Sequence, residues 1–366
     1  MAYATGPGTE NYTARFPVFH DAGFYRDFRG TQVSSLGVGT YLGEASDSDD
    51  ALYIGAIQTA LASGINLLDS AVNYRCMRSE RNIGHALREW IGEKKIVREE
   101  VVVCTKGGFI PFDGRPPADP GKYFQAEYVQ TGICAPRDVV AGCHCMAPGY
   151  LRNQVERSLQ NLGLETIDLY YLHNPETQLE EVSKDEFLNR LVRAFEELEH
   201  GVKEGKIGSY GTATWNGYRV EPGSRGHLSL ESVLKAAERA AGNSRHHFRA
   251  IQLPYNLGMP EAFTLDNQIL GTHTKPVLKA AQANGLAVFT SASILQSRLS
   301  RNLPPAVAAA FPGLPTDAQR AIQFVRSTPG VSSALVGMKR KEHVMENLKV
   351  AETTPASAES IQKLFT

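Results

Sequence analysis

Two patterns of hydrophobic and polar positions alternate along most of the chain. From residue 36 onward, short β-rich apolar runs alternate with longer segments in which apolar residues recur at helical spacing. This alternation is typical of a parallel sheet built from strand–helix units. Eight strands are predicted: Ser35–Gly39, Asn66–Asp69, Val101–Thr105, Thr166–Leu172, Ile207–Ala213, Arg249–Leu253, Leu286–Thr290 and Ser332–Val336.

The segments between these strands predict helices with one apolar face each. One such face carries Ile83, Ala86, Leu87 and Trp90. Eight units without a break in composition favour a closed (β/α)8 TIM barrel over an open doubly wound sheet. We therefore expect residues 1–366 to form a single barrel domain.

Two segments lie outside the repeating units. Residues 18–36 read as a strand, a turn at Arg29-Gly30-Thr31 and a second strand, an N-terminal β-hairpin that could close the bottom of the barrel. After the third strand, residues 107–148 form a long insertion without clear periodicity, which we expect to act as a lid. Smaller insertions are expected at residues 256–274 and 291–315.

Charge and composition exclude several classes of function. The 38 basic and 39 acidic side chains give a net charge of -1, which provides no field to attract nucleic acid or an anionic membrane surface. No apolar stretch approaches the roughly 20 residues of a membrane span, and the first residues do not resemble a secretory signal. Five cysteines are an odd number that suits reduced thiols. A cytoplasmic protein without a membrane anchor is expected.

Titratable side chains follow three consecutive predicted strands. Asp69 ends the second strand and Tyr74 lies five residues further on, Lys106 follows the third strand, and His173 follows the fourth. Active-site groups of βα barrels project from these strand ends. Each residue also has a structural interpretation, because carboxylates and lysines pair at strand ends and a histidine before Asn-Pro can cap a turn. Together the four predict a site that donates protons.

Chemical roles follow from the residue types. Tyrosine titrates near pH 10, and a neighbouring lysine cation would lower that pKa by favouring the phenolate. Lys106 would act on Tyr74 in this way, Asp69 would hold Lys106, and His173 would orient a carbonyl oxygen. A hydrolase that uses Asp69 with a second carboxylate is weaker, because no second acid follows a strand end.

The chain resembles the aldo-keto reductases over roughly residues 16–350. The motifs that carry the resemblance are LGVGTY, DSAVNY, SERNIGHAL, VVVCTKGG, LQNLGLETIDLYYLH, LVRAFEELEHGVKEGKIGSYGTA, QLPYN and VGMKRKEHVMENL, in the family's order. The resemblance implies hydride transfer between the nicotinamide C4 of a dinucleotide and a carbonyl carbon, an activity of the EC 1.1.1 type. It also implies that Asp69, Tyr74, Lys106 and His173 are the catalytic tetrad.

The resemblance further implies residues at the nicotinamide end of the cofactor. Thr40 and Tyr41 would approach the nicotinamide, and Gln252 would hold its carboxamide. Tyr255 could offer its ring to the nicotinamide or belong to the core. The family's usual Ser-Asn pair reads Ala-Thr here, so Thr214 would replace only part of it.

A second set of residues is implied for the phosphates and the adenine. The set comprises Ser293, Leu295, Arg298, Gly337, Lys339, Arg340, Lys341, Glu346 and Asn347. Three consecutive cations before a helix suit a phosphate group. We therefore expect NADP (NADPH) rather than NAD.

The insertion contains residues that can bind zinc in other proteins. They are Cys134, Cys143, His144 and Cys145. Adjacent Cys143 and His144 cannot easily face one ion, so we predict no metal site. Cys76 and Trp215 are expected in the wall of the substrate pocket.

These expectations combine into one function. The chain is predicted to be an NADP-dependent oxidoreductase of small-molecule aldehydes, ketones or sugar hemiacetals, with Tyr74 as general acid or base. The alternative is a regulatory subunit that binds a nicotinamide nucleotide with little turnover.

Overall fold

A closed barrel of eight parallel strands forms the centre of the protein. The structure is a computed structural model that describes residues 2–365. The strands follow the order β10-β13-β14-β3-β4-β5-β8-β9 around the barrel. Their bounds are β3 Leu36–Gly39, β4 Leu67–Asp69, β5 Val102–Gly107, β8 Leu169–His173, β9 Tyr210–Ala213, β10 Phe248–Pro254, β13 Ala287–Ser291 and β14 Ser333–Gly337. All eight overlap the predicted strands, so the (β/α)8 prediction is confirmed.

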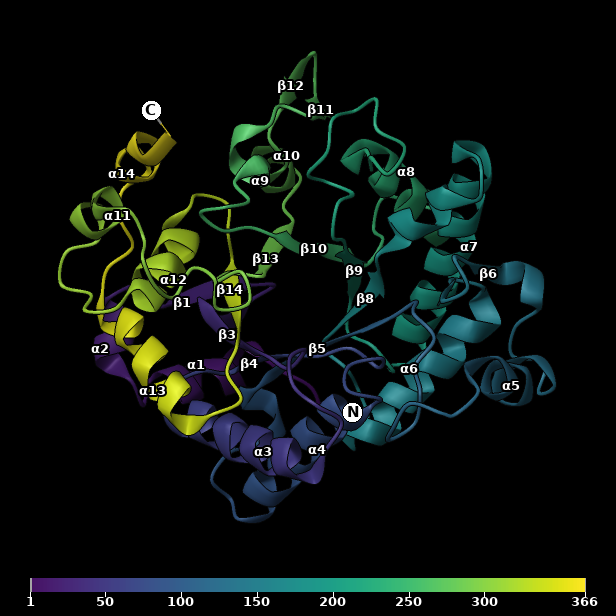
Figure 1. Ribbon diagram of the computed structural model, residues 1–366, viewed down its shortest axis with the longest axis horizontal. Helices are drawn as coiled ribbons and strands as arrows, with labels where there is room; N and C mark the ends of the chain where they lie inside the picture. Colours follow the sequence, from purple (N-terminus) through teal and green to yellow (C-terminus); the bar gives the residue numbers. More distant parts are fainter. Residues whose placement is uncertain (1, 366) are drawn as a thin grey trace.

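A ring of helices surrounds the strands (Figure 1). One helix follows each barrel strand: α3 Asp47–Ala62, α4 Arg78–Gly92, α6 Pro148–Leu162, α7 Lys184–Lys203, α8 Leu230–Ala241, α10 Val277–Ala283, α12 Asp317–Ser327 and α13 Lys341–Leu348. The predicted apolar face of α4 buries Ile83, Ala86 and Leu87 completely or nearly so. The helices therefore cover the outside of the barrel with their apolar faces, as their periodicity predicts.

The N-terminal hairpin is present and covers the N-terminal end of the barrel. Strand β1 (Tyr25–Phe28) pairs with β2 (Thr31–Ser34) in antiparallel register. Arg29 and Gly30 both have positive φ, as a two-residue hairpin turn requires. Phe28 packs edge-on against Phe289 of β13 at a centroid distance of 5.4 Å. The hairpin therefore belongs to the core of the barrel.

The first part of the predicted hairpin is not a strand. Helix α2 (Pro17–Asp21) stands there instead, and a further helix, α1 (Gly6–Thr13), precedes it. Proline has a φ suited to the first helical position and lacks the amide hydrogen that a strand would use. Pro17 stands at that position in α2, so the prediction of a strand beginning at residue 18 is wrong.

The long insertion has its own small core beside the barrel. It contains α5 (Pro120–Phe124), β6 (Val139–Val140) and β7 (His144–Cys145), and lies outside α6 in Figure 1. Tyr128, Cys134 and Cys145 of the insertion form a buried cluster with Tyr150 of α6. The remaining α-helices and strands are α9 Glu261–Thr264, β11 Gln268–Leu270, β12 His273–Lys275, α11 Pro305–Ala310 and α14 Ala358–Gln362.

Two features are absent from residues 2–365. No helix in this range combines the length and the apolar character needed to cross a membrane. No group of three or more His, Cys, Asp or Glu side chains in the same range is arranged to hold a metal ion.

Candidate active site

A cavity of about 480 Å³ opens at the C-terminal ends of the barrel strands. Asp69, Tyr74 and His173 line it. Lys106, the fourth residue predicted from strand ends, lies behind them with no exposed surface. The barrel therefore brings together all four residues, as the positions of Asp69, Lys106 and His173 at consecutive strand ends require.

A buried ion pair forms the floor of this site. Lys106 Nζ donates to Asp69 Oδ2 at 2.6 Å and to the carbonyl oxygen of Ser70 at 2.7 Å. Gln252 Nε2 donates to the other oxygen, Asp69 Oδ1, at 2.8 Å. Burial alone would lower the pKa of Lys106, but the neighbouring Asp69 carboxylate and Tyr74 hydroxyl keep it above its usual value. Lys106 is consequently a fixed cation.

Tyr74 lies directly above this cation. Lys106 Nζ is 4.9 Å from the centroid of the Tyr74 ring. Burial raises the pKa of Tyr74, and the attraction of Lys106 only partly opposes that rise. Lys106 therefore acts on the Tyr74 pKa in the expected direction, but burial has the larger effect, so the net pKa lies above its usual value. Tyr74 carries its proton at neutral pH and can act as a proton donor.

His173 faces Tyr74 across the cavity as a neutral imidazole. The two rings meet edge to face at a centroid distance of 5.8 Å. Burial lowers the pKa of His173 well below its usual value, and the positive charge of Lys106 lowers it further. Nδ1 of His173 is buried without a hydrogen-bond partner. A neutral imidazole can offer one N–H to an oxygen atom, which suits the orientation of a carbonyl group.

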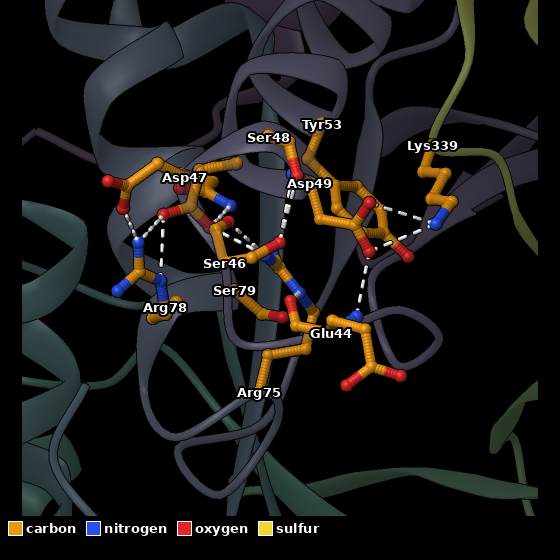
Figure 2. A network of polar contacts seen from close by, with 12 residues as sticks. Glu44, Ser46, Asp47, Ser48, Asp49, Tyr53, Arg75, Arg78, Ser79 and Lys339 are labelled. Carbon is orange, nitrogen blue, oxygen red and sulfur yellow. Dashed lines mark hydrogen bonds and ion pairs between the residues drawn. The ribbon is translucent and has the colours of Figure 1, made fainter. Parts of the chain in front are cut away.

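Arg75 anchors the turn that carries Tyr74. Its side chain is 1% exposed, and its Nε donates to the carbonyl oxygen of Glu44 at 2.9 Å (Figure 2). Its Nη2 donates to Asp50 in α3 at 2.6 Å. The guanidinium thus joins the loop after β3 to the loop after β4. Residues 75–77 all have positive φ, a strained conformation for non-glycine residues that these contacts hold in place.

Cys76 does not lie in the pocket wall. It is absent from the cavity lining, and its carbonyl oxygen accepts a hydrogen bond from the Gly114 amide at 2.9 Å. The predicted pocket role is therefore wrong, because the left-handed turn places Cys76 against the insertion. Trp215 does line the cavity, with 43% of its surface exposed.

Most residues expected near the nicotinamide line the cavity. They are Thr40, Tyr41, Thr214 and Gln252, and two residues expected at the phosphates and adenine, Ser293 and Gly337, line it as well. Thr214 Oγ1 is buried without a hydrogen-bond partner. Tyr41 contacts the Tyr74 ring edge-on at 5.0 Å.

Of the two roles expected for Tyr255, a nicotinamide contact or a core residue, the structure shows the second. Its ring is fully buried and stacks on Phe324 at a centroid distance of 5.3 Å. Its hydroxyl group lies 3.1 Å from Thr328 Oγ1. Facing the outer helices, Tyr255 is not available to a ligand in the cavity.

The other residues expected at the phosphates and adenine lie outside the cavity lining. These are Leu295, Arg298, Lys339, Arg340, Lys341, Glu346 and Asn347. Lys339 forms an ion pair with both carboxylate oxygens of Asp49, at 3.0 and 2.9 Å (Figure 2). Arg340 and Lys341 are exposed at the start of α13. The structure therefore leaves two of the three predicted cations on the surface.

Several residues that line the cavity were not identified from the sequence. They include Asn73, Phe109, Asn174 and Ile294. Asn73 precedes Tyr74, and its Oδ1 is buried without a partner. Asn174 follows His173 with a φ of 44°, a conformation that asparagine tolerates better than most residues. The Asn-Pro pair directly after the fourth predicted strand could have indicated Asn174 from the sequence.

Two proteins of known name align with half or more of this chain. A probable voltage-gated potassium channel subunit beta from Oryza sativa subsp. japonica is 25% identical over 340 residues, covering 89% of this chain and 90% of that protein. An NADH-specific methylglyoxal reductase from Escherichia coli is 31% identical over 186 residues, covering 50% of this chain and 48% of that protein.

Solved structures share the fold. An aldo/keto reductase from Klebsiella pneumoniae in complex with NADP and acetate has a TM-score of 0.61 at 21% identity, covering 92% of this chain and 91% of its own. A glycerol dehydrogenase from Gluconobacter oxydans has a TM-score of 0.63 at 20% identity, covering 94% of both chains. The model of the Aldo/keto reductase family matches residues 35–223, just over half of the sequence. The chain therefore belongs to the aldo/keto reductase family.

Proposed function

We propose that this protein is an NADPH-dependent oxidoreductase that transfers a hydride between the nicotinamide and an aldehyde, a ketone or a sugar hemiacetal. One observation carries the proposal. A protonated tyrosine, a neutral histidine and a buried lysine cation converge at one cavity, at the end of the barrel where active sites lie. The family membership supports the same chemistry.

The cavity fits the nicotinamide end of a dinucleotide. Buried polar groups without partners, Thr214 Oγ1 among them, are available to a bound carboxamide. Tyr41, Ser293 and Gly337 would border the same ligand. The cofactor, when bound, supplies the hydride that no side chain can provide.

The side chains then have distinct tasks. His173 would hold the carbonyl oxygen by one hydrogen bond, and Tyr74 would donate its proton to that oxygen as negative charge develops. Lys106 would stabilise the phenolate that remains on Tyr74. Asp69 would keep Lys106 charged and directed toward the tyrosine.

Cations after β14 support a preference for NADPH. Arg340 and Lys341 are exposed, whereas Lys339 is neutralised by Asp49. A 2′-phosphate would find partners in the two exposed side chains. The name of the Escherichia coli relative specifies NADH, so the two nucleotides are compared directly below.

The test follows NADPH and NADH oxidation in parallel against aromatic aldehydes, short ketones and free sugars. We expect turnover with both nucleotides and a higher kcat/KM with NADPH. Arg340→Ala should raise the KM for NADPH about tenfold, in line with the loss of one charged hydrogen bond, and leave the KM for NADH unchanged. Lys349→Ala, just past the other end of α13, is the matched control. Equal effects of both substitutions, or equal kcat/KM for both nucleotides, would contradict the NADPH preference.

The pH profile of reduction tests the protonation states. With saturating NADPH we expect kcat to be constant from about pH 6 to about pH 9, because His173 is neutral and Tyr74 protonated throughout this range. Activity should fall only as the pH rises through the raised pKa of Tyr74. An inflection near pH 6.5 would show instead that His173 titrates, and a loss well below pH 9 would show a lowered tyrosine pKa.

A second function is favoured by the names of two relatives. Potassium channel beta subunits of two plants are each 25% identical to this chain over 89% of it. The alternative is therefore a nucleotide-binding regulatory subunit with little turnover. Tight NADPH binding without oxidation on any carbonyl of the panel would favour this alternative.

A further inference from the structure

The inserted strand β7 carries a histidine that contacts the backbone of His173. His144 is completely buried, and its Nε2 lies 2.7 Å from the carbonyl oxygen of His173. The register of β5 and β8 ends at the pair of Gly107 and Leu172. The His173 carbonyl lies beyond that last pair. The ring of His144 thus takes the place of a neighbouring strand at this carbonyl.

The hydrogen-bond donor in this contact follows from the other side of the ring. Gln178 Nε2 lies 2.9 Å from His144 Nδ1, and an amide nitrogen can only donate. Arg190 Nη1 donates to Gln178 Oε1 at 2.8 Å, which fixes the orientation of that amide. Nδ1 therefore accepts, and Nε2 carries the hydrogen that is donated to His173. Burial lowers the pKa of His144 to about 4, so this tautomer is neutral at physiological pH.

Phe109 and Gly108 pack around the contact between the two histidines. Phe109 meets His144 edge to face at 5.2 Å and His173 at 5.0 Å. A Cβ atom on Gly108 would come within 2.7 Å of the His173 carbonyl oxygen and 2.9 Å of His144 Nε2. Gly108 also has a φ of 148°, which side chains rarely permit. Glycine at this position allows the two histidines to meet.

The insertion is tied to the barrel at the same point. The Cys145 amide donates to the Gly108 carbonyl oxygen at 2.8 Å, and the Ile110 amide donates to the Cys143 carbonyl oxygen at 2.8 Å. These bonds flank His144 on both sides. The position of the His144 ring is therefore fixed relative to β5 as well as to β8.

We propose that His144 is a positioning residue: its Nε2–H holds the His173 backbone, and thereby sets the place of the His173 imidazole in the cavity. The proposal rests on the proposed function, in which His173 orients the carbonyl group. His144 touches neither substrate nor cofactor and acts only through His173. Small displacements of such a group are costly to turnover, because a misplacement of about 1 Å can slow a reaction about 100-fold.

Two substitutions distinguish a His144 that positions His173 from a His144 that only stabilises the fold. In His144→Gln the side-chain amide nitrogen can reach the place of Nε2 and keep the bond to His173. In His144→Asn the side-chain oxygen can keep the bond from Gln178, but no donor reaches His173. Each variant retains one of the two contacts, so thermal unfolding should report a similar loss of stability for both. His144→Ala removes both contacts.

The experiment measures kcat, the KM of the carbonyl substrate, the Kd of NADPH and the Tm for wild type and the three variants. We expect kcat to fall at least about tenfold in His144→Asn and His144→Ala, and to stay within about threefold of wild type in His144→Gln. The Kd of NADPH should not change. The proposal is overturned if kcat follows Tm across the variants, or if His144→Asn matches wild type.

The outcome for wild type distinguishes the two proposals. If wild type reduces carbonyl compounds and Tyr74→Phe does not, a negative result with the His144 variants concerns His144 alone. If wild type binds NADPH without turnover, the proposed function itself fails.

Discussion

Replacing Tyr74 with phenylalanine is expected to slow carbonyl reduction between about 100-fold and about 10,000-fold, the usual contribution of a positioned general acid. The substitution removes a hydroxyl group that is protonated, buried and held beside Lys106. It keeps the ring, so its contacts with Tyr41 and His173 persist. The measurement is NADPH oxidation at saturating aldehyde, together with the Kd of NADPH, which should not change.

A neighbouring tyrosine provides the matched control. Tyr41 lies in the same cavity wall and packs against Tyr74, but 58% of its surface is exposed and Lys106 is not placed beneath it. Tyr41→Phe should retain turnover within about threefold of wild type, since it loses no group that acts on the carbonyl oxygen. A Tyr74→Phe variant with more than a tenth of the wild-type rate would exclude Tyr74 as the proton donor.

Lys106→Met is expected to reduce both stability and turnover. The substitution leaves Asp69 buried without its ion-pair partner, which costs about 3–5 kcal/mol in the free energy of unfolding. Turnover should be lost because the cation that stabilises the Tyr74 phenolate is gone. Urea denaturation measures the first effect and NADPH oxidation the second.

A double variant separates the two effects. In Asp69→Asn/Lys106→Met the buried charge is absent, while the amide oxygen introduced at position 69 can still accept a hydrogen bond from Gln252, as Asp69 Oδ1 does in wild type. Stability should return largely toward that of wild type, and turnover should remain lost. If the single variant were as stable as wild type, the pair would not be a buried ion pair; if the double variant were active, Lys106 would have no role in proton transfer.

The barrel and three residues of the tetrad could be predicted because both depend on local pattern. Strands such as β5 and β8 are short apolar runs, and Lys106 and His173 occupy their carboxyl ends, which must meet at one face of the barrel. Tyr74 was found through its spacing from Asp69 in a familiar motif. Helix α2 was missed because five residues carry too little periodicity to distinguish a helix from a strand.

Properties that depend on packing could not be read from the sequence. The net pKa of Tyr74 reflects how completely it is buried, which spacing does not reveal. Tyr255 could equally have faced the cavity or the helices, and only its contact with Phe324 decides between them. The link between His144 and His173 joins an insertion to a strand 29 residues away, and no periodic signal marks it.

The strained turn after Tyr74 bears on how the protein could be engineered. Left-handed Arg75, Cys76 and Met77 each cost conformational energy that the anchoring of Arg75 offsets. At the partly exposed Cys76, replacements that suit positive φ, such as glycine or asparagine, would relieve part of this strain without removing the Arg75 anchor, so a screen for heat resistance alone would favour them. The same replacements would loosen the segment that aims Tyr74. Variants selected only for thermal tolerance would therefore accumulate changes at the place where catalytic competence is most easily lost.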